Sequence, residues 1–229
     1  MLEEFKKTSF IYLHDIRKGF ATATGTFDAL KGINLSVNKG EFISVIGKSG
    51  SGKTTLMNMI AGIDKPRSGE IMVGEKPIHT MSENQISKWR GTNVGIVFQF
   101  FQLIPTLSVV ENVMLPMDFG KTFPLSARKE RALSLLKQVG IEDQAYKYPT
   151  ALSGGQQQRT AIARALANDP ALILADEPTG NLDTATANDV FRIFNELVKA
   201  GKTVIIVTHD TEIASRCSRI IRLADGQIV

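Results

Sequence analysis

Residues 47–54 read Gly-Lys-Ser-Gly-Ser-Gly-Lys-Thr, and they match the phosphate-binding loop pattern G-x-x-x-x-G-K-[ST]. Glycines let successive backbone N–H groups turn toward phosphate oxygens, and the helix expected over residues 53–61 adds the positive end of its dipole. Lys53 can reach the β- and γ-phosphates of a nucleotide, and the Thr54 hydroxyl can bind Mg²⁺. A chance glycine-rich turn is the alternative, and average residue usage would produce one in roughly one per cent of such chains.

Four apolar, β-branched runs are expected to form buried strands of a parallel sheet, because helical patterns lie between them. They are residues 41–46, 94–98, 171–175 and 203–208. Each run is followed at once by residues suited to phosphate or metal chemistry, namely Gly47, Gln99, Asp176 with Glu177, and His209. In open α/β sheets, ligands bind outside the carboxyl ends of the strands. The sequence therefore predicts one site built from four segments.

Two further regions flank this α/β core. Residues 9–38 hold short apolar runs separated by glycines, which predicts a small antiparallel β layer. Residues 100–150 carry no strong strand pattern and are expected to be mostly helical, with Ser126 capping a helix that stops at Gly140. A second amphipathic helix, with an apolar face over residues 190–198, is expected to end at Gly201.

The apolar run at 171–175 leads into two adjacent carboxylates. Asp176 can hold Mg²⁺ through water, because Mg²⁺ keeps much of its hydration shell. Glu177 can orient and polarise an attacking water molecule. Two solvated acids at a strand end are the alternative, and the presence of a phosphate loop in the same chain favours the chemical interpretation.

Ser153 and Gln156 form a predicted capping box at the start of a helix that runs to about Asn168. A cap explains these two residues, but it does not explain Gly154 and Gly155, which lower helix stability. Backbone N–H groups at a helix N-terminus suit an anion. The segment therefore predicts either a simple cap or a second phosphate contact.

The stretch Leu152-Ser153-Gly154-Gly155-Gln156 resembles the signature motif of the ABC ATPase family, and it lies between the phosphate loop and the Asp-Glu strand as in that family. Gln99 is similar to the Q-loop glutamine, Asp183 to the D-loop aspartate, and His209 to the switch histidine. Phe20 falls where the family places an adenine-stacking aromatic, and a core position in the β layer is the alternative. Polar residues at a turn and at a strand end are the alternatives for Gln99 and His209.

The resemblance spans nearly the whole chain and implies an α/β fold. That fold is a P-loop NTPase core of ABC type, with a mostly parallel sheet, an antiparallel β layer and a helical signature lobe. Residues 1–229 would form a single ABC ATPase domain, with the nucleotide-binding core at 1–99 and 151–229 and the helical lobe at 100–150. The activity implied is hydrolysis of ATP to ADP and phosphate, with Mg²⁺ as cofactor.

The site residues implied by the resemblance fall into three groups. ATP binding is implied for Phe20, Gly47, Lys48, Ser49, Gly50, Ser51, Gly52, Lys53, Thr54, Thr55, Gln99 and His209. Catalysis is implied for Lys53, Gln99, Glu177 and His209, and Mg²⁺ binding for Thr54, Gln99 and Asp176. Because the family pairs head to tail, Ser153, Gly154, Gly155 and Gln156 would meet ATP held by a second copy, beside the D-loop Asp183.

The partners implied are a second copy of this chain and an integral membrane permease on a separate chain, at the inner face of the cell membrane. Residues 98–105, 111–113 and 175–183 resemble a subgroup that serves lipoprotein-release, macrolide-export and cell-division systems. A machine that transmits force without moving a substrate is one alternative. A non-transport ABC ATPase acting on ribosomes or DNA is another, and the single cassette with no room for a long coiled coil counts against it.

Composition sets the remaining expectations. The net charge is +4 with no block of like charge, so no nucleic-acid partner is expected. No apolar run approaches bilayer length, residues 1–7 lack an apolar signal core, and Cys217 is the only cysteine, so a cytoplasmic protein without an internal disulfide is expected. The apolar residues Phe100, Phe101, Leu103 and Ile104 are expected either to dock a membrane subunit or to fill the helical lobe.

Overall fold

The computed structural model describes residues 9–22 and 25–229. The described residues form two compact units, one made of those up to residue 87 together with 203–229 and the other of residues 88–202. The predicted lobe boundaries at 100 and 150 both lie inside the second unit and stay a prediction. The expectation about a signal core concerns residues 1–7, which lie outside the described residues.

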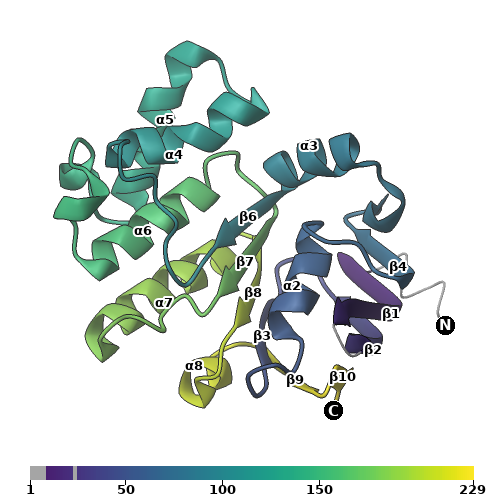
Figure 1. Ribbon diagram of the computed structural model, residues 1–229. Helices are drawn as coiled ribbons and strands as arrows, with labels where there is room; N and C mark the ends of the chain where they lie inside the picture. The colour runs from purple at the N-terminus through teal and green to yellow at the C-terminus, as the bar shows by residue number, and fades with distance from the viewer. Residues whose placement is uncertain (1–8, 23–24) are drawn as a thin grey trace. The chain divides into compact units, whose positions relative to one another are not determined.

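The first unit contains an antiparallel sheet of order β2-β1-β4-β5 (Figure 1). Its strands are β1 (Ile11–Thr22), β2 (Gly25–Val37), β4 (Ser68–Val73) and β5 (Lys76–Pro77). This confirms the predicted β layer, although the strands are longer than the apolar runs suggested. The register of β1 with β2 shifts between Leu13 and Ile16, between Ile16 and Arg17, and between Lys18 and Gly19. Asp15, within the first of these intervals, has φ of 45°.

The first unit also contains a parallel group of strands. β3 (Phe42–Ile46) is buried throughout and lies between β8 (Thr203–Val207) and β9 (Arg219–Ala224), parallel to both. β10 (Gln227–Ile228) pairs antiparallel with β9. The helix α2 (Lys53–Ala61) contacts β8 as well as β2 and β4, so it joins the parallel group to the antiparallel sheet. A short 3₁₀ turn (Ile78–Thr80) and α8 (Thr211–Ser215) complete this unit.

The second unit has one parallel strand pair, β6 (Val94–Val97) with β7 (Leu172–Asp176). Its helices are α4 (Val109–Gly120), α5 (Leu125–Gln138), α6 (Gly154–Ala165) and α7 (Thr184–Lys199), with 3₁₀ turns at Glu142–Gln144 and Pro149–Ala151. α4 packs against α5 and α6 (Figure 1), and α6 packs against β6 and α7. The helix α3 (Glu83–Asn93) begins in the first unit and ends in the second.

The predicted strands and most helix ends agree with the structure. All four predicted strands form, each within one residue at either end. Gly140 and Gly201 follow α5 and α7 with φ of 73° and 85°, as expected of glycines that end helices. The prediction that Ser126 caps a helix is wrong, because α5 begins at Leu125 and Ser126 lies in its first turn. Pro124 precedes the helix with φ fixed at −55°, and its carbonyl accepts a hydrogen bond from Ala127 N–H.

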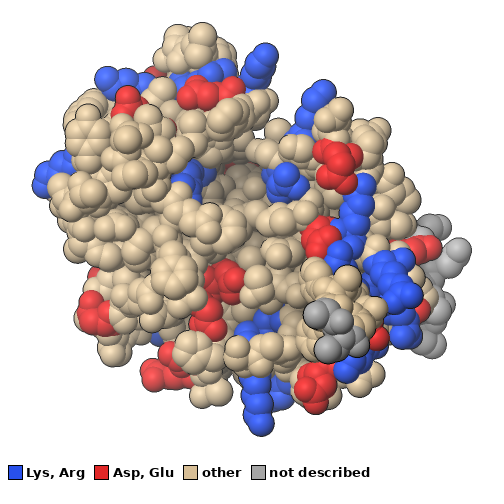
Figure 2. All heavy atoms as spheres, in the orientation of Figure 1, with Lys and Arg blue, Asp and Glu red and all other residues tan. Residues whose placement is uncertain are grey.

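Within the described ranges, no helix combines the length and the apolar character needed to cross a bilayer. Side chains of both charges share the face of the molecule drawn in Figure 2.

The longest helix of the second unit, α7, buries one stripe consisting of Val190, Phe191, Phe194 and Leu197. This is the apolar face that its helical spacing predicts.

Candidate functional site

The phosphate loop joins β3 to α2 in the first unit. Gly50 and Gly52 hold φ of 77° and 103°, which glycine adopts without a steric penalty. The Lys53 ammonium donates hydrogen bonds to the carbonyls of Gly47 (2.7 Å) and Lys48 (3.0 Å), so the side chain folds back over the loop. Gly52 precedes α2 without any side-chain cap, which leaves the N–H groups of the first turn to the backbone and to a ligand.

The predicted loop residues differ in exposure. Lys48, Ser49, Gly50 and Thr54 are exposed, Gly47, Gly52, Lys53 and Thr55 are half-buried, and Ser51 is buried. The Ser51 hydroxyl has no hydrogen-bond partner among the described residues. A buried hydroxyl without a partner inside a glycine loop fits a bound anion or its water shell.

Neighbouring strands press closely on the loop. A Cβ on Gly47 would lie 2.2 Å from the Leu223 carbonyl oxygen, and a Cβ on Gly52 would lie 2.5 Å from the Ala29 carbonyl oxygen. Both distances are too short for any side chain, so β9 and β2 together require glycine at these two positions. The phosphate-loop motif by itself predicts a role for these glycines only in phosphate binding.

The turn between β9 and β10 fastens the loop to β2. Gly226 N–H donates to the Ser51 carbonyl (3.1 Å), and the Gly226 carbonyl accepts from Lys31 N–H (2.8 Å). This support is not predicted from the sequence, because β9 alternates buried and exposed residues instead of forming a continuous apolar run. The alternating pattern of residues 219–224 is the feature that could have predicted it.

His209 lies at the same strand edge as the phosphate loop. Val45 of β3 pairs with Val207 of β8 in parallel register, and Thr208 N–H donates to the Val45 carbonyl (3.1 Å). Gly47 and His209 each follow their paired residue by two positions, so they leave the sheet at the same level. The His209 side chain is exposed there.

The second unit repeats this arrangement with Gln99 and Glu177. Val97 pairs with Ala175, and Gln99 and Glu177 each follow two residues later. Glu177 has φ of 46°, a left-handed value that is uncommon for residues other than glycine and is often found at functional sites. Asp176, the last residue of β7, is half-buried beside it.

The turn after β7 also contacts Gln99. Gly180 N–H donates to the Glu177 carbonyl (3.1 Å), and Asn181 Nδ2 donates to the Gln99 carbonyl (3.1 Å). A Cβ on Gly180 would lie 3.2 Å from Gln99 Nε2. The segments of Gln99 and Glu177 are thus held together, with Asn181 as a positioning residue.

The structure confirms the capping box at the start of α6. The Ser153 hydroxyl accepts from Gln156 N–H (3.3 Å), and the Gln156 side-chain carbonyl accepts from Ser153 N–H (3.0 Å). A Cβ on Gly155 would lie 2.4 Å from Thr186 Cγ2, so close packing on α7 requires glycine there. At Gly154 the nearest atom would be 3.6 Å away, so crowding does not explain that glycine.

Asp183 caps α7 and connects the D-loop with the start of α6. Its carboxylate accepts from Thr186 N–H (3.0 Å) and from the Thr186 hydroxyl (2.6 Å). The hydrogen bond from the Thr186 hydroxyl, followed by the backbone bonds, lowers the pKa of Asp183. Thr186 therefore contacts the D-loop through its hydroxyl and approaches Gly155 through its methyl group.

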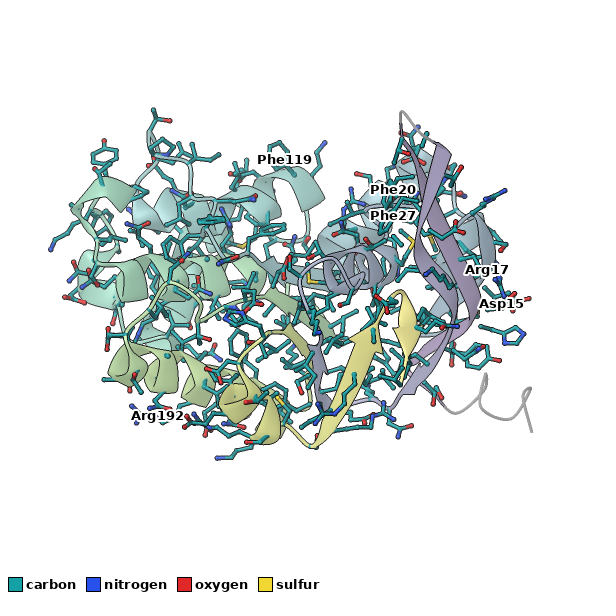
Figure 3. All side chains as sticks on the ribbon, turned by 60° about the horizontal axis from the view of Figure 1, so that its bottom comes forward. Asp15, Arg17, Phe20, Phe27, Phe119 and Arg192 are labelled. Atoms are coloured by element: carbon teal, nitrogen blue, oxygen red, sulfur yellow. The ribbon has the colours of Figure 1, made fainter. Side chains whose placement is uncertain are left out.

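Phe20 is 42% exposed on β1, so it is not a core residue of the β layer (Figure 3). Lys18 Nζ lies 5.1 Å from the centroid of the Phe20 ring, within cation–π range. The same ammonium pairs with Asp64 at 2.6 Å and donates to the Lys65 carbonyl. Phe20 is thus an exposed aromatic whose position Lys18 helps to fix.

The available donors suit Mg²⁺ held together with a nucleotide. In residues 9–22 and 25–229, no group of three or more His, Cys, Asp or Glu side chains could hold a metal by itself. Mg²⁺ in nucleotide sites takes few protein ligands, because phosphate oxygens and waters complete its octahedron. The predicted ligands Thr54, Gln99 and Asp176, a hydroxyl, an amide and a carboxylate, match that chemistry.

Comparisons with known proteins agree with this chemistry. Residues 30–180 match a family model described as ABC transporter. An uncharacterized ABC transporter ATP-binding protein of Thermotoga maritima is 43% identical over 94% of this chain and 92% of its own length. The lipoprotein-releasing system ATP-binding protein LolD of Aquifex aeolicus is 46% identical over 89% of this chain and 90% of its own.

A longer relative and a solved structure are also similar to this chain. The macrolide export ATP-binding/permease protein MacB of Syntrophobacter fumaroxidans is 44% identical over 95% of this chain, which spans 31% of that protein. The ATP-binding cassette MJ0796, solved as a dimer in a post-hydrolysis state bound to ADP and Pi, has a TM-score of 0.89 at 42% identity. That match covers 95% of this chain and 96% of the cassette.

Proposed function

Because the chain belongs to the ABC transporter family, we propose that it powers a membrane permease by binding ATP between two copies of itself. The chain is an ATPase that uses ATP with Mg²⁺. The observation that carries the proposal is the glycine loop at 47–54, which presents backbone N–H groups and the Lys53 ammonium at the carboxyl edge of β3.

The proposed mechanism assigns one task to each residue. Lys53 exchanges the loop carbonyls for phosphate oxygens, and Glu177 accepts a hydrogen bond from the attacking water. The water oxygen bonds to the γ-phosphorus, the bond to the β-phosphate oxygen breaks, and ADP leaves with that electron pair. His209 contacts the γ-phosphate. Thr54, Gln99 and Asp176 would hold Mg²⁺, which would supply positive charge beside the phosphates.

The second half of the site is proposed to come from a second copy. The start of α6 is exposed at Ser153 and Gly154, and it presents a helix N-terminus suited to phosphate. The dimeric MJ0796 cassette supports a paired form. In a head-to-tail pair, the loop of one copy and the α6 terminus of the other would hold one ATP, with a helical lobe at 100–150 immediately before that terminus.

The proposed setting is the inner face of the cell membrane, with a permease on a separate chain. LolD is named for lipoprotein release and MacB for macrolide export, which supports export or lipoprotein extraction. Force transmission across the envelope stays an alternative. The MacB relative is named as ATP-binding and permease in one protein, and this chain matches 31% of it. LolD is named as the ATP-binding protein of a releasing system, which supports a permease supplied by another chain.

The test uses Glu177→Gln, which keeps the shape of the side chain but removes its charge. With MgATP, light scattering should give twice the mass of the nucleotide-free protein, and phosphate release should be very slow. The control is Lys53→Ala with Glu177→Gln, which should lose ATP binding and stay at the lower mass. An unchanged mass of Glu177→Gln under saturating ATP would contradict the paired site, and near-wild-type turnover would remove Glu177 from catalysis.

A further inference from the structure

The β1–β2 hairpin carries a second exposed phenylalanine beside Phe20. Phe20 pairs directly with Phe27 in the antiparallel register, and their exposures are 42% and 54%. Side chains at directly opposite positions project from the same face of a strand pair, with Cβ atoms about 5 Å apart. Figure 3 labels the two residues next to each other on this hairpin. Together they form one apolar surface, called here the two-ring platform.

The platform lies two strand residues away from Ala29, the β2 residue that packs on the phosphate loop. Ala29 follows Phe27 by two residues on β2, and its carbonyl oxygen lies 2.5 Å from the place of a Cβ on Gly52. Two strand residues span about 6.6 Å. A nucleotide with its phosphates at Gly52 would extend its ribose along β2 and bring its base onto the platform.

Among the described residues, Phe20 makes a cation–π contact and Phe27 makes none. Lys18 Nζ lies 5.1 Å from the Phe20 centroid and is itself fixed by Asp64. The Phe27 ring is more exposed than that of Phe20 and contributes apolar area. Large exposed aromatic area beside a ligand site suits a flat, stackable group.

We propose that Phe27 forms the base-binding surface together with Phe20, so that the site takes purine nucleoside triphosphates in preference to pyrimidine ones. This inference rests on the proposed function of the phosphate loop and goes beyond it by adding a residue that determines base selection. Two phenyl rings offer area but no hydrogen-bonding groups, and a purine covers more of that area than a pyrimidine. The platform therefore discriminates by the size of the base.

The experiment measures equilibrium binding of ATP, CTP and inorganic tripolyphosphate, each with Mg²⁺, to the full chain. Phe27→Ala should weaken ATP binding about tenfold, as expected for loss of one stacking partner, and CTP binding less. Binding of tripolyphosphate, which has no base, should not change. Phe27→Tyr should restore ATP affinity, and Phe119→Ala, which removes a phenylalanine that is 80% exposed on α4, serves as the matched control.

Three outcomes contradict the inference. ATP affinity of Phe27→Ala within about twofold of wild type would remove Phe27 from the base site. Equal losses for ATP and tripolyphosphate would show that the substitution acts on the loop instead of on the base, and equal losses for ATP and CTP would contradict selection by base size. Wild-type protein that binds neither ATP nor tripolyphosphate would contradict the proposed function itself, so the two failures are distinguishable.

Discussion

The Arg164 guanidinium, on α6, donates hydrogen bonds to the backbone carbonyl of Phe101 at 2.7 Å and to that of Gln102 at 2.5 Å. Both acceptor residues hold left-handed backbone conformations, with φ of 56° and 50°. Burial of the charged side chain lowers the pKa of Arg164. The helix that begins with the signature motif therefore holds the segment after Gln99 in a conformation that these residue types do not favour on their own.

Replacing Arg164 by Met should release that segment. The change keeps the apolar stem but removes both hydrogen bonds, so the free energy of unfolding should fall by about 1–3 kcal/mol. ATP turnover should fall as well, because Gln99 is two residues from the released segment. Urea denaturation and steady-state phosphate release would measure the two effects.

The control is Arg192→Met, on α7, whose side chain is 72% exposed. An exposed ion pair contributes little, so this change should stay within about 0.5 kcal/mol of wild type. If both arginine variants lose the same stability and activity, the two carbonyl contacts of Arg164 have no special role.

The two glycines that begin α6 should respond in opposite ways to alanine. Gly155→Ala would place its Cβ 2.4 Å from Thr186 Cγ2, so it should destabilise the protein by about 1–3 kcal/mol. Gly154→Ala meets nothing closer than 3.6 Å and should stabilise the helix by about 0.5–1 kcal/mol. Thermal and urea unfolding of the two purified variants would compare them.

A second substitution tests the cause of the Gly155 effect. Thr186→Ser removes the methyl group that would lie too close to an alanine Cβ at position 155. It keeps the hydroxyl that donates a hydrogen bond to the Asp183 carboxylate. In the Thr186→Ser background, Gly155→Ala should therefore cost much less than in wild type. If the cost stays the same in both backgrounds, contact with the Thr186 methyl group is not the cause.

The sequence predicted those strands whose residues are buried on both faces of the sheet. β3, β7 and β8 are buried on both faces, so their apolar runs are continuous and their ends were correct within one residue. β9 was missed because its two faces differ. Ser126 was assigned as a cap by residue type, whereas Pro124 fixes the backbone before the helix.

Contacts that depend on strand register, or on packing between residues far apart in the sequence, could not be predicted from local sequence patterns. The direct pairing of Phe20 with Phe27 is set by the register of β1 with β2, which the apolar runs of the sequence do not record. The contact of Arg164 with Phe101 joins residues that lie far apart in the sequence. The motif residues themselves were predictable because phosphate chemistry fixes their spacing, as in the loop at 47–54.

The apolar segment after Gln99 divides between the surface and the interior. Phe100 is 73% exposed and Ile104 is 37% exposed, whereas Phe101 and Leu103 are half-buried. If this segment docks a permease, Phe100→Glu should abolish co-purification with that subunit but leave the melting temperature and basal ATPase activity unchanged. Phe119→Glu, at a residue 80% exposed on α4, is the matched control. Normal co-purification of Phe100→Glu would refute docking through this side chain.

Cys217 should make stability fall with rising pH in the alkaline range. Burial raises the pKa of its thiol from 9.0 to about 11, since the charged thiolate is poorly solvated there. The unfolded chain loses this proton near pH 9 and the folded chain near pH 11, so the unfolded state binds fewer protons between those values. The contribution of the neutral thiol to stability is therefore complete below about pH 9 and is lost as the pH rises toward 11.

The measurement compares wild type with Cys217→Ala, so that effects common to the two proteins cancel in the difference. Wild-type unfolding free energy should fall more steeply than that of the variant between pH 9 and pH 11, with no difference in slope between pH 6 and pH 8. Alkylation by iodoacetamide at pH 8 should be much slower for the folded protein than for the urea-unfolded chain, because the thiolate is the reactive form. Equal alkylation rates in the two states would show that the fold neither raises the thiol pKa nor restricts access to Cys217.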